Sequence, residues 1–94
     1  MEIQFTTRVF KEGGTFIAHA LELDVSSCGS SAKKAVQNLK EAVRLFLEEC
    51  GKMGTLAQVL EEAGYTKSGR EFRGPKIVSM QQISLPLPLT HAKA

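Results

Sequence analysis

Two carboxylates that lie two positions apart, Glu22 and Asp24, are the side chains of this chain best placed for chemistry. Two-metal cleavage of a phosphodiester needs several acids that converge on one point. Glu22 and Asp24 fall on a Leu-Glu-Leu-Asp corner where they could share a face, but the first predicted strand adds no acid, since its polar positions are Gln4, Thr6 and Arg8. Carboxylates at such a corner are usually solvated. The sequence therefore predicts no catalytic residue and no enzyme.

Histidine and cysteine are too few and too scattered to predict a metal or a cofactor. His19 stands alone in the middle of a predicted strand and His91 lies in the tail. Cys28 and Cys50 are too far apart for a zinc framework. We expect both to be buried free thiols in a reducing cytoplasm, with a disulfide between them as the open alternative.

The charge of the chain is nearly balanced, with a formal net charge of +2. The surplus lies in the segment 67–76, whose basic members are Lys67, Arg70, Arg73 and Lys76. Glu71 interrupts this run, and Phe72 is available to stack on a base. A duplex-binding face usually has a stronger basic bias. A solvated basic loop is the simpler interpretation, and weak nucleic-acid binding through 67–76 is the alternative.

At 94 residues the chain has the length of one domain, which we place at 1–88, followed by a disordered tail at 89–94. It contains no apolar run of about 20 residues, the length that a membrane span requires. The first four residues, Met1 to Gln4, lack the basic start and apolar stretch of a signal peptide. We therefore expect a cytoplasmic protein that does not contact a membrane.

The elements that position these residues begin with three predicted strands. Residues 2–10 alternate between apolar and polar, which predicts a strand with one face on the core. The two glycines in 11–14 predict a tight turn. Residues 15–21 are apolar on both faces and read as a central strand, and the small residues of 25–30 form the third. Together they predict an antiparallel three-stranded meander.

Two helices follow. Ser31 is placed to cap a long helix, and Gly51 is predicted to end it. The apolar stripe of this helix comprises Ala32, Ala35, Val36, Leu39, Val43, Phe46, Leu47 and Cys50. Thr55 and Gln58 form a capping-box pattern at the start of a short second helix, which Gly64 ends.

The C-terminal part is predicted to contain a flexible loop at 66–75 and a fourth strand at 76–85. Pro86 and Pro88 then prevent further strand pairing. Because the loop is long, the last strand could pair with the sheet of another protomer, which makes a homo-oligomer (a dimer or a tetramer) our expectation. The predicted fold class is α+β, with the order β-β-β-α-α-β.

Residues 16–50 resemble the HicB-like antitoxin family of type II toxin–antitoxin systems. The family pattern is an aromatic-x-Ala strand, a Leu-containing corner, a Cys/Gly-rich strand and an amphipathic helix. Here the strand has Phe16 and Ala18, the corner is 21–24, the third strand contains Cys28, and the helix segment is 35–43. The resemblance implies a partial ribonuclease H-like fold, in agreement with the predicted order of elements.

The function implied by this resemblance is stoichiometric inhibition without turnover. A HicB-like protein binds a small HicA-like ribonuclease toxin and occludes its active site. Many members also carry a DNA-binding segment, but after Leu85 only nine residues remain, so we do not expect this chain alone to bind operator DNA. The second hypothesis is a stand-alone oligomeric scaffold or binding module that has lost its toxin, and the third is the nucleic-acid binder described above.

Overall fold

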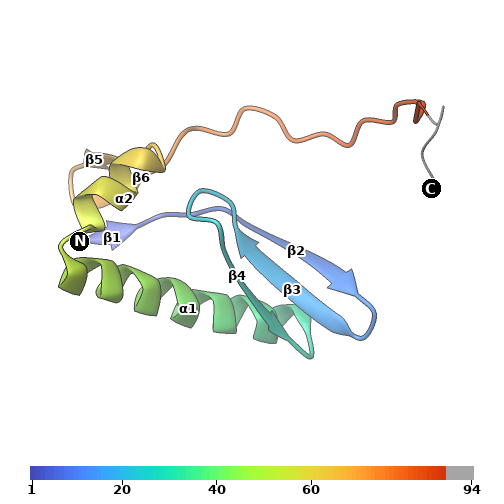
Figure 1. Ribbon diagram of the computed structural model, residues 1–94, viewed down its shortest axis with the longest axis horizontal. Helices are drawn as coiled ribbons and strands as arrows, with labels where there is room; N and C mark the ends of the chain where they lie inside the picture. Colours follow the sequence, from blue (N-terminus) through green and yellow to red (C-terminus); the bar gives the residue numbers. More distant parts are fainter. Residues whose placement is uncertain (89–94) are drawn as a thin grey trace.

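The main layer of the fold is an antiparallel sheet with strand order β2-β3-β4 and one long helix packed on one face (Figure 1). The strands are β2 (Thr7–Glu12), β3 (Thr15–Ala20) and β4 (Val25–Gly29), and the helix is α1 (Ala32–Met53). This is a computed structural model that describes residues 1–88; the tail predicted at 89–94 lies outside the described residues. The predicted meander and long helix are confirmed.

Small side chains allow α1 to approach the sheet closely. Ala18 and Ala20 on β3 are fully buried against Ala35 and Leu39 of α1. At the end of β4, a Cβ added to Gly29 would lie 2.7 Å from the backbone nitrogen of Ala35. Leu39 is the largest side chain buried completely, so the core is narrow and mainly aliphatic.

The start of α1 agrees with the prediction and its end does not. The Ser31 hydroxyl accepts a hydrogen bond from the Lys34 amide at 3.1 Å, as an N-cap should. Gly51 does not end the helix, which continues to Met53. Gly54 provides the left-handed cap instead, with a φ of 74°, and its amide donates to the Cys50 and Gly51 carbonyls. The added residues bring the chain to the start of the second helix.

The predicted stripe of α1 faces the core over most of its length. Ala35, Leu39, Val43 and Cys50 are buried. Val36, Phe46 and Leu47 are half-buried, whereas Ala32 in the first turn is exposed.

The predicted capping box of the second helix, α2 (Leu56–Glu62), does not form. Thr55 has a φ of −107° and a ψ of 2°, so its hydroxyl does not reach the helix amides. It donates instead to the Cys50 carbonyl at 3.4 Å. The Gln58 side chain donates to Glu62 at 3.0 Å. The connection after α1 is too short to give Thr55 the extended backbone that a capping residue needs.

A second small sheet lies near the C-terminal end of α1 and has the order β1-β6-β5 (Figure 1). Its strands are β1 (Glu2–Ile3), β5 (Thr66–Ser68) and β6 (Glu71–Arg73). The segment 66–75, predicted to be a flexible loop, is therefore mostly a hairpin, and Gly69 makes its turn with a φ of 63°. β6 runs parallel to β1, pairing Glu2 with Glu71.

The first predicted strand, 2–10, is divided because the chain changes partner at Gln4–Thr6. The Gln4 amide donates to the Phe72 carbonyl at 3.0 Å, whereas the Thr6 carbonyl accepts from the Leu21 amide at 2.9 Å. The predicted inward face is wrong for β2, whose six residues are all exposed. The reason is that α1 packs mainly under β3 and β4 and leaves the β2 edge uncovered.

The fourth strand predicted at 76–85 is not formed within one copy. Residues 74–88, which we call the arm, extend away from the body without strand pairing (Figure 1). The fold class is nevertheless as predicted: α+β, with three strands, a long helix, a short helix and then strands, the last of which is β6.

Candidate partner-binding surface

The two corner carboxylates, Glu22 and Asp24, have separate structural partners and do not share a face. Glu22 accepts hydrogen bonds from the Thr6 amide and the Thr6 hydroxyl, both at 2.8 Å. Asp24 has a left-handed φ of 53° and lies 2.7 Å from His19 Nε2. His19, expected to lack a nearby acid, thus pairs with one. Glu22 therefore binds the corner to Thr6, and Asp24 binds it to His19.

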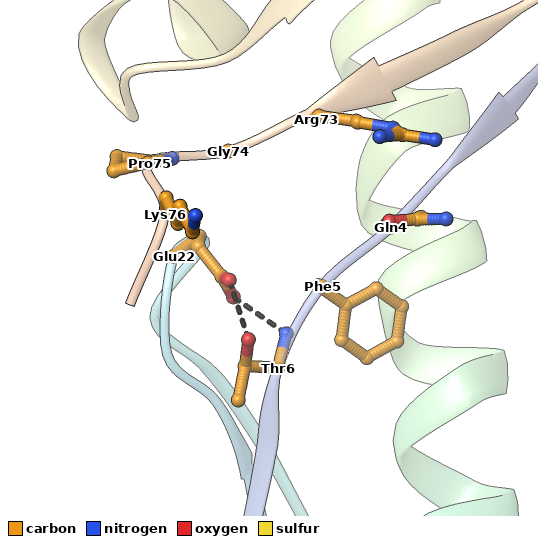
Figure 2. A pocket seen from close by; sticks show the side chains of 8 residues that line it. All are labelled: Gln4, Phe5, Thr6, Glu22, Arg73, Gly74, Pro75 and Lys76. Carbon is orange, nitrogen blue, oxygen red and sulfur yellow. Dashed lines mark hydrogen bonds between the residues drawn. The ribbon is translucent and has the colours of Figure 1, made fainter. Parts of the chain in front are cut away.

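Glu22 lies in a pocket of about 480 Å³ where the N-terminal strands and β6 diverge, which we call the junction pocket. Its lining residues are Gln4, Phe5, Thr6, Glu22, Arg73, Gly74, Pro75 and Lys76. Figure 2 shows the Glu22 carboxylate directed at Thr6, whereas Phe5 points toward α1. Because both carboxylate oxygens accept hydrogen bonds from Thr6, this acid connects two parts of the backbone, and the pocket serves as an anchor for chain segments.

Tyr65 also contacts the chain next to this pocket. Its hydroxyl donates to the Gln4 carbonyl at 2.6 Å. Burial, together with the nearby charge of Glu22, raises the pKa of the Tyr65 phenol to about 12. The phenol therefore remains a neutral donor across the physiological range and joins the α2–β5 connection to the β1–β2 connection.

Two closely packed glycines, Gly64 and Gly74, lie where the arm begins. Gly64 has a φ of 82°, and a Cβ there would lie 2.8 Å from the Pro75 ring. A Cβ on Gly74 would lie 3.0 Å from Glu22 and 3.4 Å from Tyr65. This close packing fixes the direction in which the arm starts.

Beyond its root the arm is apolar, uncharged and exposed. Residues 77–88 contain no charged side chain. The exposed fractions are 89% for Val78, 76% for Ile83 and 81% for Leu85. A stretch of this composition, with high β propensity and no charge, is one that proteins normally cover.

A second apolar surface lies between α1 and the N-terminal strands, and we call it the α1–β1 groove. It consists of two adjoining hollows of about 480 and 530 Å³. Its apolar lining comes from Ile3, Phe5, Val36, Val43, Leu47 and Leu56, and Lys40 lines both hollows. Arg44 and Glu48, which form an ion pair, lie at its polar rim.

The basic segment 67–76 is more ordered than predicted. Phe72, expected to be free for stacking, is half-buried and packs against the core. Arg73 donates to Glu71 at 3.0 Å. Of the two cysteines, Cys50 is a buried free thiol as expected, whereas Cys28 is also free but exposed.

The groove is a feature that the sequence did not reveal, whereas the segment of the arm was already predicted to be a strand that could pair with another protomer. The groove depends on the parallel pairing of β1 with β6, which brings together segments at opposite ends of the chain and leaves no local pattern. The arm did have a signal, its uncharged run. Within residues 1–88, no three metal-ligating side chains cluster, and neither helix is long and apolar enough to cross a membrane.

Comparison of the chain with models of protein families, with characterised proteins and with solved structures found no match.

Proposed function

We propose that this protein is a HicB-like antitoxin, a non-catalytic binding protein that occludes a small HicA-like ribonuclease toxin. Two observations support the family. Residues 16–50 carry the strand, corner and helix pattern described above. The first half of the chain also has the order of elements that this resemblance implies, three antiparallel strands followed by a long helix.

The observation that carries a binding function is the amount of apolar surface that one copy leaves open. Six large apolar side chains of the arm are at least 43% exposed: Ile77, Val78, Met80, Ile83, Leu85 and Leu87. Soluble monomers rarely expose contiguous apolar surface of this extent unless it binds another protein. The two corner carboxylates, by contrast, already serve as hydrogen-bond acceptors within the fold.

The test is a titration of ribonuclease activity. The tagged chain is purified from its native host after nuclease treatment, and the mass of any companion is measured. The companion, once stripped under denaturing conditions and refolded, should cleave RNA. Adding the chain back should reduce cleavage at least tenfold, with a sharp break at one chain per toxin, because occlusion is stoichiometric.

An equal amount of an unrelated protein of similar net charge is the control and should leave cleavage unchanged. A companion without ribonuclease activity, or inhibition that needs a large excess of the chain, contradicts the proposal.

A stand-alone oligomeric scaffold is the second candidate, and the exposed arm favours it specifically, since a second copy could cover that surface. Recovery of the chain only with itself supports this candidate over the antitoxin. The nucleic-acid hypothesis has less support, because Phe72 packs inward and Arg73 is paired with Glu71.

A further inference from the structure

The outer edge of β2 is an open position in the main sheet. Among residues 1–88, β2 pairs with β3 alone. Val9 and Phe10 are 39% and 44% exposed and point to opposite faces of this edge strand. β2 also carries three exposed charged residues, Arg8, Lys11 and Glu12, and the Lys11 ammonium lies back across β3, 5.4 Å from the centre of the Phe16 ring. The unpaired backbone N–H and C=O groups of such an edge are a template for another strand.

The α1–β1 groove lies beside this edge, on the helix side of the sheet. The pairing register places Thr7 opposite Ala20 and Val9 opposite Ala18, the two alanines that α1 covers. Thr7 also lines the larger hollow, together with Val36 of α1. A strand added outside β2 would direct every second side chain into this hollow, whose size suits several apolar groups.

The arm has the length and composition of such a strand. Residues 77–85 span about 30 Å when extended, compared with about 20 Å for the six residues of β2. Val78 and Met80 share one face of an extended chain, whereas Ile83 and Leu85 share the other. This two-sided character matches an edge whose exposed residues also point both ways. Pro86 then ends the segment that can pair.

The arm does not reach the β2 edge of its own copy. Pro75 is packed on Gly64 at its root, and Ile77 and Met80 then pass the corner at Leu21. From there the arm runs clear of the body (Figure 1), so that Val78 keeps 89% of its surface exposed. The β2 edge is thus not occupied by the arm of its own copy, and the arm of another copy has the length and composition to occupy it.

We propose that two copies of this chain exchange arms: residues 77–85 of each copy add to the outer edge of β2 of the other and fill its α1–β1 groove. Each sheet then has four strands, and the same contact occurs twice around a two-fold axis, which closes the assembly as a dimer. This inference is independent of the toxin, because it requires only the chain itself.

The test measures mass in solution by light scattering coupled to size-exclusion chromatography, using the full chain at about 1–100 µM. The wild-type chain of 10.3 kDa should have twice its own mass. Val78→Pro removes a backbone donor from the arm and should weaken the dimer at least tenfold. Leu87→Pro, which lies between two prolines, is the matched control and should leave the dimer intact.

A complementation experiment identifies the edge. Val9→Asp places a charge at the β2 edge and should also give a monomer, with Phe10→Asp as the substitute if the first variant does not fold. The Val78→Pro chain keeps an intact edge and the Val9→Asp chain keeps an intact arm. An equimolar mixture of the two should therefore form a heterodimer at a concentration where each chain is monomeric alone.

Three results would overturn the proposal. A monomeric wild-type chain over this concentration range excludes exchange, whether the arm is free or folds onto its own edge. A Val78→Pro chain that remains dimeric shows that the arm is not the contact. A Val9→Asp chain that remains dimeric shows that the arm binds elsewhere. None of these results bears on ribonuclease inhibition, so the antitoxin proposal stands or falls separately.

Discussion

Replacing Gly51 with alanine should stabilise the fold, and the sign of the effect distinguishes two descriptions of the same helix. The sequence favours Gly51 as a left-handed cap, where alanine would be strained. The structure places Gly51 inside α1, with no atom within 4 Å of an added Cβ. Glycine in a helix interior is destabilising by roughly 0.5–1 kcal/mol relative to alanine, chiefly because its unfolded backbone has more freedom.

The expected gain in the free energy of unfolding for Gly51→Ala is therefore about 0.5–1 kcal/mol. For a domain of this size that corresponds to a rise in Tm of roughly 2–8 °C. The assay is thermal unfolding followed by circular dichroism at 222 nm. All variants are compared at one protein concentration, because Tm depends on concentration if the chain self-associates.

Gly54→Ala is the matched comparison. Gly54 has a φ of 74°, and a left-handed backbone costs a residue with a Cβ roughly 1–2 kcal/mol. This variant should therefore lower Tm. A lower Tm for Gly51→Ala, or an unchanged Tm for Gly54→Ala, would refute the assignment of the helix end.

Three further predictions concern the core and the junction. Gly29→Ala should lower the free energy of unfolding in urea by about 1–3 kcal/mol, because the new Cβ meets backbone atoms at 2.7 and 2.9 Å. Gly14→Ala is the control: its Cβ has open space, so the same measurement should change by no more than about 0.5 kcal/mol. Leu39→Ala should lower the free energy of unfolding by about 2–5 kcal/mol, because Leu39 is fully buried. Leu45 is half-exposed on α1, so Leu45→Ala should lower it by about 0.5 kcal/mol or less. Equal losses for the two variants in urea unfolding would contradict the described core. Tyr65→Phe should lower the free energy of unfolding by about 1 kcal/mol near neutral pH. Because the pKa of the folded phenol is raised from 10 to about 12, its contribution to stability is complete below pH 10 and is lost as pH rises through 12. The difference in unfolding free energy between the two proteins should therefore shrink between pH 10 and 12.

Elements with a strong local pattern were predictable from the sequence. The spacing of Ala35, Leu39, Val43 and Cys50 identified the buried face of α1, since one turn of a helix sets that spacing. Ser31 was recognisable as a cap from its type and position alone. The hairpin of β2 and β3 followed from two adjacent glycines between alternating segments.

Features that depend on distant segments could not be predicted. β1 pairs in parallel with β6 across nearly 70 positions, and this pairing is what divides the first predicted strand. The strands β5 and β6 have three residues each, too short to show an alternation, so a polar stretch with glycines resembled a loop. Likewise, the partners of Glu22 and Asp24 were decided by the geometry of the corner, which brings Thr6 to one and His19 to the other.

The arm is a different case, because its sequence has the composition of a strand and its single-copy structure has none. A strand is stabilised by hydrogen bonds and side-chain contacts with a neighbour, so β propensity alone cannot produce one. Within one copy, the arm runs clear of the body and does not pair with the open β2 edge that could supply those contacts (Figure 1). The prediction of a fourth strand and the observation of an unpaired arm are then compatible if the neighbour belongs to a second copy. The same reasoning accounts for the absence of charge in 77–88: a segment that stayed in water would gain nothing from it, whereas one that pairs with β2 and turns one face into an apolar groove is favoured by it.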